Sequence, residues 1–170
     1  MVTTWRVALG PGCFIPARLF LAALALAATP SAAFGQARPG AQAAPAAPVP
    51  DRSSALKMVW SMMAAVDHAN RTGNYSVLRD LGTPAFQANN NPAALGAIFA
   101  GLRERGIDLS ETLTVTPTWE FEPRMVSPAV LRMRGAFPLR PSAILFDLLF
   151  KWDRGWRLEG IAVQAAQPVG

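Results

Sequence analysis

Asp67 is the residue whose type and position in this 170-residue chain best suit acid–base chemistry. It lies on the apolar stripe of a helix that the hydrophobic spacing predicts from Ala55 to about Thr72. A carboxylate on that stripe would face the protein interior, where burial suits a general base. The alternative is an ion pair with Arg71, which lies one helical turn further along the chain. We take the ion pair as the default interpretation and keep the general base as the alternative.

The other titratable residues give no further catalytic or metal-binding pattern. His68 is the only histidine, and its surroundings lack the His, Cys and Asp spacing typical of metal ligands. Asp147 interrupts an apolar strand. Because side chains alternate along a strand, Asp147 lies on the face opposite the apolar one, where Arg132 would be an ion-pair partner. The sequence has no Ser-His-Asp set, glycine-rich phosphate loop or Walker motif. We therefore expect neither a cofactor nor a metal ion.

The first 37 residues indicate a secretory signal peptide. An apolar run from Leu19 to Ala28 follows sparse basic residues and is too short to span a bilayer. Small residues after it offer cleavage near residue 33 or residue 37. Cys13, the only cysteine, would leave with the signal, so no disulfide or thiol chemistry is expected. The prediction is a secreted or periplasmic protein without a stable membrane span after cleavage.

Composition divides the remaining chain into three parts. Residues 38–52 are rich in Ala and Pro and indicate a flexible linker, residues 53–165 form the predicted domain, and residues 166–170 form a disordered tail. The formal net charge is +5, and its basic residues are scattered rather than grouped in runs. That distribution is typical of a solvated surface, so no nucleic-acid partner is expected.

The order of predicted elements is helices first and strands afterwards. Helical segments are expected at Ala55–Thr72, Tyr75–Leu81 and from Asn91-Pro92 to about Arg105, with a further turn at Thr83-Pro84. Strands are expected at Thr112–Glu122 and Val130–Pro138 and in a hairpin from Ala143 to Val163. The predicted fold class is α+β, with N-terminal helices packed on a curved antiparallel four-stranded sheet.

The closing hairpin sets the two faces of the sheet. It turns at Asp153-Arg154-Gly155, which would set Trp152 opposite Trp156. Strict alternation then gives the outer face a set of apolar residues among charged ones: Leu145, Leu149, Ile161 and Val163. An apolar patch rimmed by charges usually marks an interface, so we expect a homodimer through this outer sheet face.

At this point the chain resembles the nuclear transport factor 2-like superfamily, which includes ketosteroid isomerase, scytalone dehydratase and the polyketide cyclases. The resemblance covers roughly Ser53 to Gln164 and rests on three segments: Asn70–Asp80, Thr83–Phe86 and Phe150–Leu158. It implies a cone in which helices close over a concave sheet and leave a pocket. The predicted lining is mostly aromatic and apolar: Trp60, Met63, Asp67, Phe99, Trp119, Phe146, Phe150, Trp152 and Trp156.

Two functions follow from the resemblance. The first is a binding or interaction module without catalysis, taking a small apolar ligand or a protein, because the predicted pocket wall lacks convergent polar groups. The alternative is a small lyase, hydratase or isomerase that acts on an apolar substrate without a cofactor. In that case Asp67, by its position on the helix stripe, would be the base, and the resemblance implies Tyr75 as the group that polarises the substrate.

Overall fold

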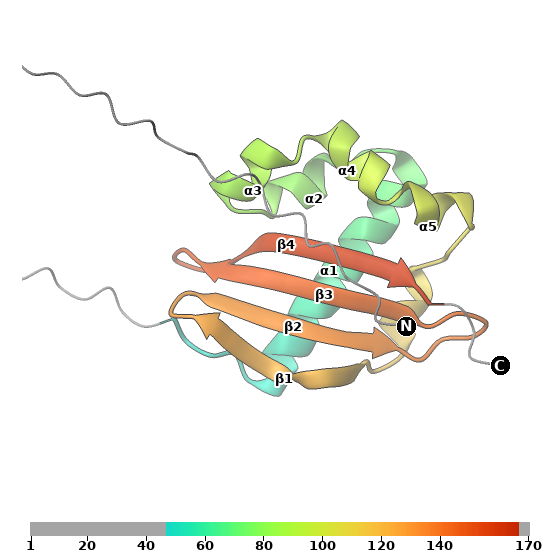
Figure 1. Ribbon diagram of the computed structural model, residues 1–170. Helices are drawn as coiled ribbons and strands as arrows, with labels where there is room; N and C mark the ends of the chain where they lie inside the picture. The colour runs from blue at the N-terminus through green and yellow to red at the C-terminus, as the bar shows by residue number, and fades with distance from the viewer. Residues whose placement is uncertain (1–46, 167–170) are drawn as a thin grey trace, which may run out of the picture. The chain divides into compact units, whose positions relative to one another are not determined.

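The computed structural model describes residues 47–166 (Figure 1). The predicted signal peptide, including Cys13, lies outside the described residues, as do residues 38–46 of the predicted linker and residues 167–170 of the predicted tail. Between residues 47 and 166, no helix has both the length and the apolar character needed to cross a membrane.

The first helix forms where the sequence predicts it. Helix α1 spans Arg52–Thr72, and the carboxylate of Asp51 caps it by accepting a hydrogen bond from the backbone N–H of Ser54 at 2.7 Å. It ends at Gly73, whose φ of +73° lies in the left-handed region that glycine adopts at little cost. Helix α1 is about six turns long, and its buried residues run from Ala55 to Ala69.

Four short helices follow α1: α2 (Ser76–Asp80), α3 (Pro84–Asn89), α4 (Pro92–Ile98) and α5 (Ala100–Glu104). Thr83 and Asn91 cap α3 and α4 through their side-chain oxygens, and a proline follows each cap, as predicted. The single helix predicted to reach Arg105 is divided, because Phe99 leaves the helical region with φ −96° and ψ 8°. That break lets the buried Phe99 ring stack on Tyr75.

The predicted strand Thr112–Glu122 is wrong over its first half. The segment Ser110–Thr114 forms a 3-10 helix, η1. Local hydrogen bonds take up its polar groups: Asp108 accepts from the backbone N–H and the hydroxyl of Ser110, and the Thr112 hydroxyl donates to the Leu109 carbonyl. Such side-chain bonds compete with strand pairing, which sequence alternation alone does not reveal.

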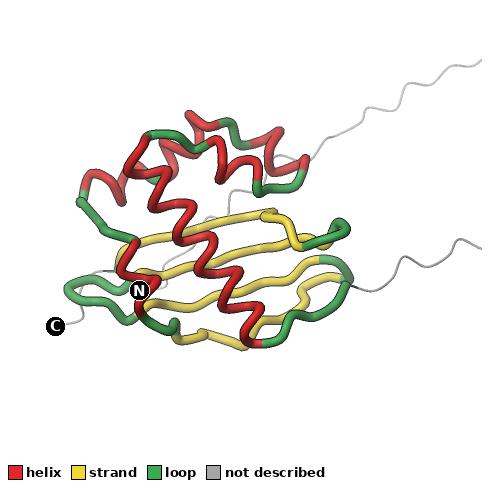
Figure 2. Tube along the Cα trace, turned by 180° about the vertical axis from the view of Figure 1, so that it is seen from behind, coloured by secondary structure: helices red, strands yellow, loops and turns green. Residues whose placement is uncertain are grey.

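The four strands form one antiparallel sheet in chain order: β1 (Thr118–Ser127), β2 (Val130–Phe137), β3 (Ile144–Trp152) and β4 (Trp156–Ala165). Helix α1 crosses one face of this sheet (Figure 2), and α2 to α5 lie along the β4 side (Figure 1). The fold is therefore α+β, with helices packed against a four-stranded antiparallel sheet. We call the face under α1 the inner face and the opposite one the outer face.

The core lies between α1 and the inner face. Its fully buried members come from both layers: Val59, Met63, Val66, Leu131, Met133, Phe137, Phe146, Leu148 and Leu158. Each large side chain removed from water there contributes about 1.5–3 kcal/mol, so this layer carries most of the stability of the domain.

A β-bulge in β4 corrects the predicted outer face. Phe150 pairs with Leu158, but Leu149 pairs with Gly160, so Glu159 is an extra residue in the strand. Every residue after it changes face: Ile161 lies opposite Leu148, Val163 lies opposite Phe146, and both are buried. The predicted interface residues Ile161 and Val163 therefore belong to the inner face, and only Leu145 and Leu149 remain outside.

Candidate functional site

The residues predicted to line a pocket lie in or beside the core. Met63, Phe99, Phe146 and Phe150 are 0, 1, 1 and 3 % exposed. Trp119 packs edge-on against Phe146, with ring centroids 5.8 Å apart. These contacts are those of packed interior side chains. The apolar pocket itself remains a prediction.

The remaining tryptophans lie at the borders of the core. Trp152 pairs with Trp156 as predicted, and their rings meet edge-on with centroids 5.2 Å apart. The indole N–H of Trp60 donates to the Val115 carbonyl at 3.3 Å, while the indole nitrogen of Trp119 is buried without a partner among the described residues.

Asp67 forms the ion pair that the sequence favours. Its carboxylate lies 2.9 Å from the guanidinium of Arg71, and Arg71 also lies 2.9 Å from Asp108. Hydrogen bonding to Asp67 raises the pKa of Arg71. Two hydrogen bonds from Ser110, the hydroxyl first and the backbone N–H second, lower the pKa of Asp108. One arginine thus joins the end of α1 to the turn before η1.

Tyr75 is also held by neighbouring helices. Its hydroxyl donates to Asn70 Oδ1 at 2.6 Å and accepts a hydrogen bond from Arg103. The ring is 2 % exposed, and its centroid lies 6.1 Å from that of Phe99. The hydroxyl therefore ties α1 to α5, which is a structural role.

The cleft that Asp67 lines does not include Tyr75. A cleft of about 360 Å³ lies near the end of α1, and its lining is polar: Asp67, Asn70, Arg71, Arg103, Gly106, Ile107 and Asp108. Tyr75 is not among these residues, and the acid of the proposed pair is neutralised by Arg71. His68 is exposed, and no group of three potential metal ligands occurs among residues 47–166.

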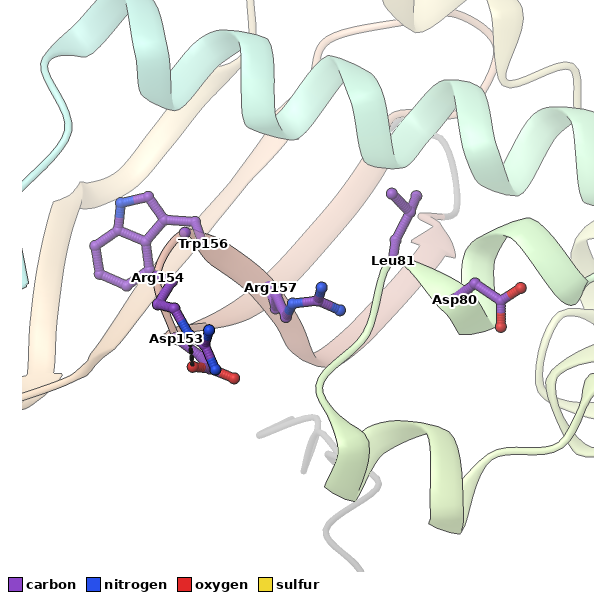
Figure 3. A pocket seen from close by; sticks show the side chains of 7 residues that line it. Asp80, Leu81, Asp153, Arg154, Trp156 and Arg157 are labelled. Carbon is purple, nitrogen blue, oxygen red and sulfur yellow. Dashed lines mark ion pairs between the residues drawn. The ribbon is translucent and has the colours of Figure 1, made fainter.

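A second cleft, of about 640 Å³, lies beside the tip of the β3–β4 hairpin (Figure 3). It separates the tip from the connection between α2 and α3, which carries Leu81. Arg157 extends toward that connection and donates to the Gly82 carbonyl at 3.3 Å, whereas the carboxylate of Asp80 is turned away from the hairpin (Figure 3). Arg154 is almost fully exposed and 3.9 Å from Asp153. Apart from Arg157, the charged side chains of this cleft pair with residues adjacent to them in the sequence.

The outer face carries a network of ion pairs, of which the sequence predicts only a part. Arg132 forms the predicted pair with Asp147, through contacts of 2.9 and 2.5 Å. This hydrogen bonding raises the pKa of Arg132. Arg134 pairs with Glu120 at 2.8 Å, whereas a regular hairpin centred near Val126 would set Arg132 opposite Glu120. Irregular pairing within β1 shifts the register and causes this difference.

Phe121 is the outer-face residue that sequence alternation misses. The same irregularity pairs it with Arg134, so its ring lies outside. The guanidinium carbons of Arg124 and Arg132 lie 4.0 and 6.0 Å from its centroid. An aromatic ring near two arginines on β1 and β2, together with the half-buried Leu149 opposite Arg132 on β3, gives the outer face both apolar and cationic groups.

Neither a known family model nor a curated protein nor a solved structure matches this chain. The resemblance to the nuclear transport factor 2-like superfamily, including its cone shape, therefore stays a prediction.

Proposed function

We propose that this protein is a non-catalytic protein-interaction module whose binding surface is the outer face of its sheet. The observation that carries the proposal is the set of side chains on the outer face. It presents Phe121, Leu145 and Leu149 as half-buried apolar groups among charged ones. Helix α1 lies against the inner face and α2 to α5 lie along the β4 side, so no described helix crosses the outer face (Figures 1 and 2). Aromatic residues and arginines together are the composition enriched in protein interfaces.

The positions of the candidate catalytic groups support the same proposal. Asp67 is paired with Arg71, Tyr75 with Asn70 and Arg103, and Asp147 with Arg132. A general base must reach the proton that it removes, and a polarising hydroxyl must reach the same substrate. These side chains instead join one element to the next. The alternative enzyme, with Asp67 and Tyr75 acting together, therefore has less support than the interaction module.

The test is photo-crosslinking inside cells that produce the protein. p-Benzoylphenylalanine at position 121 keeps the natural ring and adds a benzoyl group to it, and the control places it at position 77, where α2 exposes 64 % of Val77. We expect a discrete crosslinked protein from position 121 and none from position 77. Crosslinks from position 77 alone, or from neither position, would contradict the proposal.

A homodimer through the outer face stays a second form of this proposal. Its predicted patch is reduced to Leu145 and Leu149, because the bulge at Glu159 turns the other two residues inward. Sedimentation of the parent and of Leu149→Lys distinguishes this case: a dimer that becomes a folded monomer means that the partner is a second copy.

We also propose export to the periplasm or the medium, on the basis of the apolar run and small residues near the start of the sequence. N-terminal sequencing of the protein from the envelope fraction should find a chain that begins near Phe34 or Arg38. Soluble cytoplasmic protein that retains Met1 would reject this proposal.

A further inference from the structure

The outer face contains two pairs of like charges directly opposite each other. Arg124 lies opposite Arg132 between β1 and β2, and Lys151 lies opposite Arg157 between β3 and β4. Like charges in opposite positions destabilise a sheet, so folding gains nothing from them. Two such pairs on one face require another explanation. We call these four residues the basic patch.

Within residues 47–166, only one member of the basic patch has a carboxylate partner. Asp147 binds Arg132, and no other carboxylate of this range lies within ion-pair distance of the four side chains. Arg124 is exposed and its guanidinium lies over the ring of Phe121, and Lys151 is exposed and its side chain has no hydrogen bond or ion pair to another described residue. Arg157 donates to a carbonyl, which leaves its charge uncompensated. The patch therefore keeps three cations available for an anionic partner.

The dimensions of the basic patch suit a short extended segment. It reaches from β1 to β4, a width of about 14 Å at roughly 4.8 Å per strand spacing. Five residues in extended conformation span about 16 Å. The same face carries Phe121 and Leu149, which are half-buried. Their exposed apolar area can be covered by apolar side chains of a partner.

We propose that the basic patch binds an acidic segment of a partner protein in which carboxylates alternate with apolar side chains. This inference rests on the proposed function and adds the chemistry of the partner. The carboxylates would pair with Arg124, Lys151 and Arg157, and the apolar side chains would cover Phe121 and Leu149. Because the cations are exposed, binding should weaken as the salt concentration rises.

The test measures the binding of a fluorescent peptide by anisotropy. The peptide Glu-Phe-Glu-Leu-Glu, flanked by Gly-Ser, is compared with the same peptide in which Gln replaces Glu. The variant Arg124→Gln with Lys151→Gln has a control of equal charge change on α1, Arg52→Gln with Lys57→Gln, where both side chains are exposed. None of the four side chains has a hydrogen bond or ion pair to another described residue, Arg124 loses its contact with the Phe121 ring, and circular dichroism verifies folding.

The parent and the α1 control should bind the acidic peptide equally, and the patch variant should bind it at least about tenfold more weakly, since charge pairs at an interface are typically worth this much. The Gln peptide should not bind. Equal weakening in the control would show that net charge alone is responsible and would overturn the proposal. Tighter binding of phosphatidylglycerol vesicles or of a DNA duplex would also overturn it, as would absence of peptide binding. A crosslink at position 121 without peptide binding would leave the interaction module in place and reject only the acidic partner.

Discussion

Breaking the Arg132–Asp147 pair should reveal how far the outer face depends on one buried carboxylate. The Asp147 side chain is 1 % exposed and the Arg132 side chain is 29 % exposed, so the arginine supplies most of the compensation for a charge that water scarcely reaches. Arg132→Met would leave Asp147 buried without a cation. Loss of one partner of a buried pair costs about 3–5 kcal/mol, and the partial exposure of Arg132 places this case near 3 kcal/mol.

The double variant Arg132→Met with Asp147→Leu separates the burial of charge from the packing of side chains. Replacing both members by apolar groups of similar size is often neutral, so the free energy of unfolding should return to within about 1 kcal/mol of the parent. Urea denaturation of the parent, both single variants and the double variant closes the cycle. Losses that simply add in the double variant would refute the reasoning, because they would mean that the two charges do not compensate each other.

Three further outcomes are expected. Gly135→Ala should destabilise the protein by about 1–3 kcal/mol or more, because a Cβ there would lie 2.3 Å from the Thr118 carbonyl oxygen. In the control Gly101→Ala the new Cβ meets nothing within 4 Å, so thermal melting should find this variant neutral or stabilised by up to about 1 kcal/mol. Thr83→Val should cost about 1–2 kcal/mol in urea denaturation, because the hydroxyl caps α3 at the Phe86 N–H and donates to Glu159; an unchanged midpoint would contradict both contacts. The pKa of Asp108 is lowered in the fold, so its stabilisation is present above the unfolded value and is lost as the pH falls through the folded one. The stability difference between the parent and Asp108→Asn should therefore vanish in acid, and a difference that persists there would contradict the assignment.

Local signals in the sequence predicted those parts of the fold that depend on neighbours along the chain. Gly73 ends α1, and Thr83 and Asn91 begin α3 and α4, because caps act within a few residues. The turn after Trp152 fixes its pairing with Trp156. The ion pair of Asp67 with Arg71 likewise follows from helical spacing alone.

Features that depend on an extra residue in a strand were not predictable from alternation. Counting by twos across Glu159 places Ile161 and Val163 outside, and one inserted residue reverses both. The cause is non-local: Glu159 accepts a hydrogen bond from Thr83, and the backbone on either side of Gly82 bonds to Leu158. A similar irregularity in β1 turns Phe121 outward beside Arg124. The Arg124–Arg132 half of the basic patch therefore becomes visible only when the true register of β1 is known, whereas the Lys151–Arg157 half follows from the turn after Trp152.

The most direct measurement of the central claim is the yield of photo-crosslinking from position 121 in three backgrounds. These are the parent, Asp67→Asn with Tyr75→Phe, and Arg124→Gln with Lys151→Gln. If the outer face is the binding surface, the yield should be unchanged by the first pair of substitutions and largely lost with the second. A yield that is lost with Asp67 and Tyr75 and preserved without Arg124 and Lys151 would contradict the claim and favour a function centred on the helices.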